Sequence, residues 1–300
     1  MRSVLVGIFN LLFALAAAPL LDGILRQVKA RLHSRRGPSI FQTYLDLGKL
    51  MVKDDQAGAN NTIFSLTPIV CFASVLLAAL FIPMGGVVPL GFAGDTLVLM
   101  YILTMGPLCV CLGGMASGSP YAYVGVSREI MTLMVVEPVM VMSLIASAVK
   151  AHSLMLVDCI RQPLGAGPSL SFIICGVAFF LALQPEVAKV PFDQAEAEQE
   201  IMEGPLVEYS GRKLAMLKWS FYSKQIVLIT LFTEWFLPWP ALESLPLRMA
   251  CTVLKVLVVA ALVEVIAQVF PRLKINQSMR YFVSVNAFAL SGLMLAVIGL

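Results

Sequence analysis

Acidic side chains gather in one stretch, residues 186–208, of a chain in which 59% of the residues are hydrophobic. Seven of the eighteen Asp and Glu residues fall in this stretch. Asp193, with Glu196 three positions later, has the spacing of a helix cap and its reciprocal acid, so a helix is predicted to begin there. On that helix Glu196, Glu200 and Glu203 share one face.

Like charges that lie close together beside a membrane repel one another, and little water is present to screen them. We therefore expect some acids of this stretch to bind protons well above the ordinary carboxyl pKa. Acidic residues also favour the first turn of any helix, so a solvated surface segment explains the same pattern. Both interpretations stay open at this point.

Other ionisable residues fall within or directly beside apolar segments, where a charge is costly and is a functional candidate. Glu137 directly precedes Pro138, which cannot donate a helix hydrogen bond, so a polar irregularity is expected there. Glu234 and Lys255 belong to adjacent segments and are placed to pair, whereas Lys255 and Glu264 are out of phase. Structural ion pairs explain the same residues. The predicted proton-pathway and coupling residues are Asp193, Glu196, Glu198, Glu200, Glu203, Glu208, Glu129, Glu137, Glu234, Lys255 and Glu264.

Runs of about twenty apolar residues recur along the chain, which is typical of helices that span a bilayer. We predict eight spans, at residues 4–21, 63–82, 96–115, 130–149, 170–184, 219–237, 247–268 and 279–299. Lys and Arg concentrate on one set of loops, so both termini are expected outside and the acidic stretch in the cytoplasm. The short fifth span is retained because removing it would break this charge distribution. The first is expected to be a retained span rather than a cleaved signal, since a dense basic segment follows it.

The predicted fold class is therefore an all-α polytopic membrane protein. A single membrane domain is expected over residues 1–300, with cytoplasmic loops at 22–61, 116–129 and 186–218. Six Cys residues form no C-x-x-C pair and the two His residues lie far apart, so no metal or cofactor site is predicted in this chain. The net charge of +3 gives no indication of nucleic-acid binding.

The first predicted cytoplasmic loop contains a basic turn followed by an amphipathic segment. Ile40, Tyr44, Leu47 and Met51 form an apolar stripe at helical spacing, which predicts a helix at the membrane surface. An anchor among lipid headgroups and a docking surface for a partner protein are both consistent with it. The predicted docking residues of this loop are Arg35, Arg36, Gly37, Pro38 and Gln42.

Residues 190–211 resemble the cytoplasmic loop of the respiratory complex I membrane protein known in mitochondria as subunit 1. The positions that fit without a gap are Pro191, Phe192, Asp193, Glu196, Ala197, Glu198, Glu200, Gly204, Glu208, Tyr209, Ser210 and Gly211. The Arg36-Gly37-Pro38 turn and the Glu137-Pro138 pair are similar to the same family, so the likeness covers essentially the whole chain.

Several departures from the respiratory pattern resemble the membrane subunit of group 4 [NiFe] hydrogenases, of the formate hydrogenlyase and hydrogenase-4 type. Ala195 stands where quinone-using enzymes usually have Pro, and Glu203 replaces a small residue before Gly204. Residues 199–206, 216–219 and 30–38 also look like that branch. These differences put a quinone site in doubt.

The resemblance implies a subunit without redox chemistry of its own, in a bacterial or archaeal cytoplasmic membrane. It would seat hydrogenase large and small subunits that carry the nickel–iron centre and iron–sulfur clusters, and would contact an antiporter-like membrane subunit and lipids. Tyr209, Ser210 and Gly211 join the predicted docking residues on this ground. Two alternatives are the quinone-site membrane subunit of an NADH-quinone oxidoreductase and an independent proton-coupled transporter.

Overall fold

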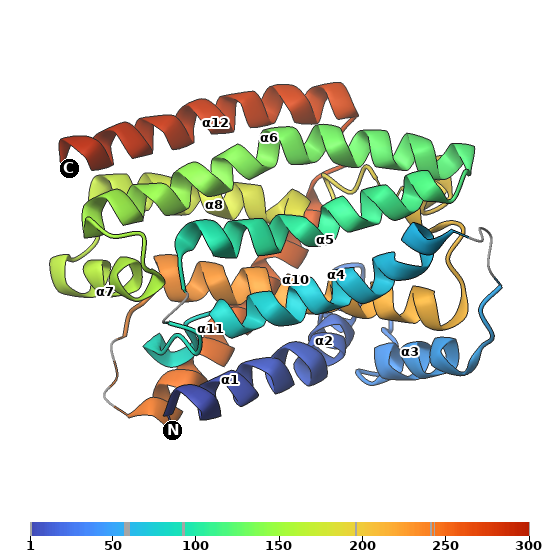
Figure 1. Ribbon diagram of the computed structural model, residues 1–300, viewed down its shortest axis with the longest axis horizontal. Helices are drawn as coiled ribbons and strands as arrows, with labels where there is room; N and C mark the ends of the chain where they lie inside the picture. The colour runs from blue at the N-terminus through green and yellow to red at the C-terminus, as the bar shows by residue number, and fades with distance from the viewer. Residues whose placement is uncertain are drawn as a thin grey trace.

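A computed structural model describes residues 2–56, 61–91, 94–195, 197–240, 242 and 244–299. These residues form helices that run side by side along the long axis of the molecule (Figure 1). The helices are α1 (Arg2–Leu12), the π-helix η1 (Phe13–Ala17), α2 (Ala18–Leu32), α3 (Gln42–Val52), α4 (Thr62–Phe81), the 3₁₀-helix η2 (Met84–Gly86), α5 (Thr96–Ala116), α6 (Pro120–Ala151), α7 (Leu156–Ala166), α8 (Leu170–Glu186), α9 (Glu198–Ile201), the 3₁₀-helix η3 (Gly204–Leu206), α10 (Gly211–Phe236), α11 (Leu245–Val269) and α12 (Ile275–Ile298).

Six helical segments of the described chain are long and apolar enough to cross a bilayer, which confirms an all-α polytopic membrane protein. They are residues 3–32, 62–81, 96–116, 120–151, 245–269 and 275–298. The other two predicted spans correspond to α8 and α10. The first has 17 residues and packs against both α6 and α12. The second carries several charges, and its residues 225–236 are all buried in the centre of the bundle.

Several predicted loops are in fact partly helical. The first helix continues to Leu32, where Lys29 and Arg31 in its last turn stabilise the negative end of the helix dipole. Most of the predicted loop 116–129 is the start of α6, which begins at Pro120, a residue suited to the first helical turn. The predicted outer loop after α6 contains α7.

The predicted amphipathic helix is present as α3, and it packs against α2 and α10. Thr43 and Leu47 are buried, whereas Phe41 and Leu45 are exposed. Gly23 of α2 permits the close approach, because a Cβ atom there would lie 1.9 Å from the carbonyl oxygen of Ile40. The segment before α3 therefore rests directly on the backbone of α2.

The prediction of a helix beginning at Asp193 is wrong. Among the described residues of 193–203, only the four of α9 are helical, and the helix ends because Met202, Glu203 and Gly204 all have positive φ angles. Glu203 therefore cannot share a helix face with Glu200. Glu196 lies outside the described residues, so its part in the predicted face has no structural account. Tertiary contacts override the local capping signal, because Asp193 pairs with Arg272 instead of capping a helix.

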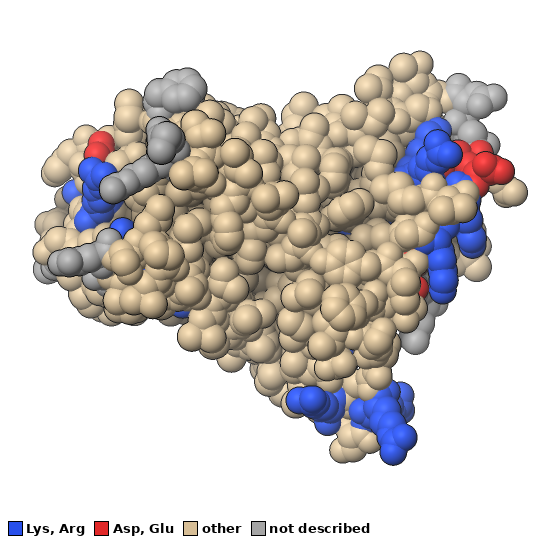
Figure 2. Space-filling model, turned by 90° about the horizontal axis from the view of Figure 1, so that it is seen from below, with Lys and Arg blue, Asp and Glu red and all other residues tan. Residues whose placement is uncertain are grey.

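In Figure 2 charged side chains lie at the two ends of the molecule and on a protrusion at the bottom of the view, and the rest of this face is almost free of charge. Lys and Arg are concentrated toward the end where α3 lies in Figure 1. An uncharged band between charged ends is expected of a protein whose middle is embedded in a bilayer.

Candidate functional site: a charged cavity beside the acidic segment

A cavity of about 300 Å³ opens among α2, α4, α5, α6, α8 and α10. It lies beside the acidic segment, which is the acidic stretch of residues 186–208 that begins at the end of α8. Apolar residues such as Val75, Leu103 and Val227 form much of its wall. The acidic and basic residues that line it are Asp22, Arg26, Glu129, Glu186, Lys189, Glu203, Lys218 and Lys224. Four acids and four bases thus face one hollow inside a membrane protein.

The pair between Lys224 and Glu186 is the most deeply buried ion pair of the cavity. The Lys224 Nζ atom lies 2.8 Å from Glu186 Oε2, and the side chains are only 12% and 8% exposed. Lys218, on the same helix, lies 3.7 Å from Glu203. α10 therefore supplies two ammonium groups that neutralise acids at both ends of the segment 186–203.

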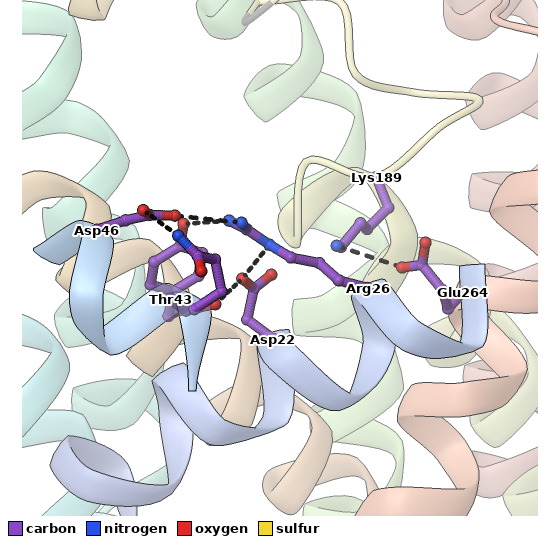
Figure 3. A network of polar contacts seen from close by, with 8 residues as sticks. Asp22, Arg26, Thr43, Asp46, Lys189 and Glu264 are labelled. Atoms are coloured by element: carbon purple, nitrogen blue, oxygen red, sulfur yellow. Dashed lines mark hydrogen bonds and ion pairs between the residues drawn. The ribbon is translucent and has the colours of Figure 1, made fainter. Parts of the chain in front are cut away.

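Asp22 and Arg26 of α2 form the edge of the cavity toward α3 (Figure 3). Arg26 Nε lies 2.7 Å from Asp22 Oδ2, and its Nη1 lies 3.6 Å from Asp46 Oδ2. Thr43 donates to Asp22 at 2.9 Å, and Arg26 donates to the hydroxyl of Tyr222 at 3.2 Å. These bonds hold the surface helix α3 against the cavity wall.

Lys189 and Glu264 join the cavity to α11 (Figure 3). Their charged atoms lie 3.3 Å apart, and the Glu264 side chain is 5% exposed. Gln268 donates to Glu264 at 2.9 Å and is bonded through its oxygen to exposed His33 at 2.8 Å. As expected from their phase, Glu264 and Lys255 do not pair, because Glu264 is held by Lys189.

The acidic segment is tied to the bundle by separate ion pairs rather than by a shared helix face. Asp193 pairs with Arg272 at 2.8 Å, and Glu200 pairs with Arg128 of α6 at 2.7 Å. The hydrogen bond from Arg128 holds the pKa of Glu200 below its ordinary value. Glu200 is therefore not among the acids of this stretch whose pKa is raised, as was expected for some of them. Glu208 is half-buried, and the side chain of Glu198 lies outside the described part.

Glu129 is the cavity acid that takes part in no ion pair among the described residues. The other three acids are paired, Asp22 with Arg26, Glu186 with Lys224 and Glu203 with Lys218. Glu137 lies two turns further along α6, a rise of about 12 Å, and is half-buried. Of the predicted pathway residues, the structure brings Glu129 and Glu203 into the cavity and places Glu137 beyond it.

The expected direct pair between Glu234 and Lys255 is not formed. Glu234 accepts a hydrogen bond from Thr252, and Lys255 donates to the carbonyl of Leu237 at 2.7 Å. The ammonium group therefore caps the C-terminal end of α10, where unpaired carbonyls attract a cation.

The predicted docking residues fall into two groups. Arg35, Arg36, Gly37 and Pro38 are exposed at the end of α2, and the Gln42 side chain donates to Asp46. Residues 209–211 instead make contacts within the chain.

Tyr209 is buried, and its ring stacks on Phe64 with centroids 4.1 Å apart. Burial raises the pKa of Tyr209 to about 12, so its hydroxyl remains a donor, to the Phe64 carbonyl. Ser210 exchanges two hydrogen bonds with the backbone of Gln56, and a Cβ atom on Gly211 would lie 2.6 Å from a carboxylate oxygen of Asp55. The Tyr209 side chain is therefore engaged within the chain, and its role in docking a partner stays a prediction.

Sequence reasoning missed six charged members of the site, which are Asp22, Arg26, Glu186, Lys189, Lys218 and Lys224. A signal was present, because Lys224 lies inside the predicted sixth span and Asp22 directly follows the first. Among the described residues, no group of three or more His, Cys, Asp or Glu side chains is arranged to hold a metal ion.

Known proteins resemble this chain over nearly its whole length. The family model described as NADH dehydrogenase matches residues 4–298. Hydrogenase-4 component C of Escherichia coli (strain K12) is 39% identical over 285 residues, which cover 88% of this chain and 89% of that protein. Formate hydrogenlyase subunit 4 of the same organism is 35% identical over 285 residues, covering 91% and 92%. A subunit of the NADH-quinone oxidoreductase of Geobacter metallireducens is 32% identical over 237 residues, covering 71% and 72%.

A solved structure shares the arrangement of the helices. A chain of the membrane-bound sulfane sulfur reductase, an archaeal respiratory membrane complex, superposes with a TM-score of 0.89 at 25% identity, covering 99% of this chain and 100% of that one. These matches confirm the resemblance predicted from residues 190–211, including its hydrogenase character.

Proposed function

Because this chain belongs to the NADH dehydrogenase family of membrane proteins, we propose that it is the coupling subunit of a membrane-bound [NiFe] hydrogenase complex of the formate hydrogenlyase type. In this proposal the chain anchors the redox subunits and links their electron transfer to ion movement. The identities of 39% and 35% to the two hydrogenase relatives, against 32% to the NADH-quinone oxidoreductase relative, favour this assignment over a quinone-site subunit.

The observation that carries the proposal is the position of Glu129 in the charged cavity. The other cavity acids are neutralised by Arg26, Lys218 and Lys224, so Glu129 is the carboxylate free to exchange a proton. A cavity of about 300 Å³ has room for about ten waters, which can deliver that proton. In this proposal Glu137, the next acid along α6, receives it.

The acidic segment is the element that senses the redox subunits. Its ion pairs reach α6 through Glu200 and Arg128, and reach the end of α11 through Asp193 and Arg272. A change of charge in the redox subunits that rest on this segment moves the paired side chains. The pair of Glu203 and Lys218, which lines the cavity, transmits this movement to the cavity. Glu129 then takes a proton from cavity water and passes it through water to Glu137.

The proposed partners follow from this arrangement. The hydrogenase large and small subunits, which hold the nickel–iron centre and iron–sulfur clusters, would rest on the acidic segment and the exposed turn 35–38. An antiporter-like membrane subunit would lie beside Glu137. The end of the bundle that carries α3 and the acidic segment would face the cytoplasm of a bacterial or archaeal cell, and lipids would surround the uncharged band.

Purification of the complex that contains this chain tests the assignment. Hydrogen evolution driven by reduced ferredoxin or formate, with [NiFe] hydrogenase subunits present, is the expected result. Quinone-linked NADH oxidation by the same preparation would overturn it in favour of the quinone-site subunit. Solute transport by this chain alone in liposomes would overturn it in favour of an independent carrier.

A further inference from the structure

A stripe of buried polar side chains runs along α10 from the charged cavity toward the opposite end of the bundle. Ser220, Ser223, Thr230 and Glu234 lie at positions i, i+3, i+10 and i+14, which share one face of a helix. All four are buried, and the stripe rises about 21 Å from the first to the last. Val227, at i+7, and Leu231, at i+11, are apolar residues on the same face.

Val227 separates two hollows. It lines the charged cavity together with Ser220, and it also lines a small void together with Thr230 and Asn10 of α1. The void has a volume of about 10 Å³, about the space that one water molecule needs. Val227 is thus the α10 side chain that faces both hollows.

Asn10 supplies an independent indication that the void binds a polar guest. Its Nδ2 atom donates to the carbonyls of Ala79 and Ile82, at 3.0 and 2.9 Å, which fixes the orientation of the amide. Its Oδ1 atom is buried and has no hydrogen-bond partner among the described residues. A buried acceptor without a partner is costly, and a bound water would satisfy it.

The stripe ends in a polar cluster at the end of the bundle away from the acidic segment (Figure 1). There Glu234, which is 7% exposed, accepts a hydrogen bond from Thr252. Two cations stand nearby on α11, since Lys255 donates to the carbonyl of Leu237 and Arg248 to the carbonyl of Gly85 at 3.3 Å. The carboxylate of Glu234 can therefore bind a proton at this end of the stripe, and polar side chains of α11 surround it.

We propose that protons cross this chain along the stripe Ser220, Ser223, Thr230 and Glu234, with Val227 as the apolar gate between two water sites. The inference rests on the proposed function for the supply of protons to the cavity, and adds an exit that does not pass through Glu137. A proton from cavity water protonates the water beside Asn10 when Val227 moves aside, and that water passes a proton to the carboxylate of Glu234. Glu234 then releases its proton to water at that end of the bundle, so one proton enters, one leaves, and the waters, hydroxyls and carboxylate are restored.

A passive leak assay tests the gate without any redox reaction. The purified complex is reconstituted into vesicles with a trapped pH dye, and a pH gradient is imposed. We expect Val227→Thr to speed proton entry about tenfold, because a hydroxyl in the barrier offers a hydrogen bond to the passing water. Val256→Thr is the matched control, since Val256 is a buried valine of α11 that lines neither hollow.

A second pair of variants tests the path beyond the gate. Adding Thr230→Val to Val227→Thr should abolish the extra leak, because it removes the next hydroxyl of the stripe at nearly constant shape. Adding Thr233→Val should not, since Thr233 is equally buried but lies off the stripe. Both hydroxyls donate to backbone carbonyls of their own helix, so the two changes lose similar bonds.

Two results would overturn the proposal. One is a Val227→Thr complex that leaks protons no faster than its Val256→Thr control. The other is a Val227→Thr leak that the added Thr230→Val and Thr233→Val changes reduce equally. Should Val227→Thr fail to assemble, Glu234→Gln decides the question. We expect it to halve or abolish turnover-driven proton release while hydrogen evolution in detergent is unchanged, and undiminished release would refute the path. Hydrogen evolution itself reports on the proposed function, so the two failures are distinguishable.

Discussion

Replacing Lys224 by Met removes the cation from the most deeply buried ion pair of the cavity. Glu186 then keeps a carboxylate that is 8% exposed and has lost a partner at 2.8 Å. Breaking a buried pair in this way costs about 3–5 kcal/mol, because the remaining charge is poorly solvated. Water in the adjoining cavity solvates part of it, so the lower end, about 3 kcal/mol of unfolding free energy, is expected.

The double variant Lys224→Met with Glu186→Gln distinguishes the interaction energy of the pair from the effects of the two single substitutions. Since both charges are gone together, no unpaired carboxylate remains, and we expect about 1–2 kcal/mol of the loss to be regained. The matched control is the pair of Arg128 and Glu200, in which Glu200 is 53% exposed. An exposed pair of this kind couples by no more than about 1 kcal/mol.

Buried thiols provide the assay. Cys71, Cys111, Cys159 and Cys175 are buried free cysteines, so a maleimide dye reacts with them only as the chain unfolds. A titration with denaturing detergent, followed with this dye, gives the unfolding free energy of the four proteins of each cycle. Equal coupling energies for the two pairs would refute the reasoning, as would a Lys224→Met protein as stable as the unaltered one.

Three further predictions concern the segments around the cavity. Gly23→Ala should release α3 from α2, because the added Cβ meets the Ile40 carbonyl at 1.9 Å; faster proteolysis within residues 33–41 measures the release. Gly204→Ala should loosen the acidic segment, since Gly204 has a φ of +52° and a Cβ there meets a backbone carbonyl at 2.1 Å; binding of the redox subunits should weaken, and unchanged binding would contradict this. The lowered pKa of Glu200 means that its pair with Arg128 stabilises the fold above the ordinary carboxyl pKa and that this contribution is lost as the pH falls through the folded-state pKa. The small difference in melting temperature between the unaltered protein and Glu200→Gln should therefore vanish at low pH and at high salt, and persistence in both conditions would contradict it.

The positions of the membrane helices and of α3 could be predicted because hydrophobic periodicity is a local property of the sequence. The apolar pattern of Ile40, Tyr44, Leu47 and Met51 predicted the surface helix, and the structure has a helix at Gln42–Val52, with Ile40 just before it. Helix ends were less predictable. Polar residues such as those of 22–32 continue a helix beyond the bilayer, where hydropathy no longer marks it.

The arrangement of the acids could not be read from their spacing. A capping signal at Asp193 competes with Arg272, which lies 79 positions later, and the tertiary ion pair prevails. The pair of Glu186 and Lys224 likewise joins two segments whose contact depends on how α8 and α10 pack. Sequence showed that acids were concentrated here, but only the fold shows which of them face the cavity and which are neutralised.

The central claim is that Glu129 carries an exchangeable proton between the redox reaction and the membrane. The most direct measurement is the number of protons moved per hydrogen molecule evolved by the reconstituted complex, with Glu129→Gln compared with the unaltered chain. We predict that the variant still evolves hydrogen while the proton count falls toward zero. An unchanged ratio in Glu129→Gln would contradict the account.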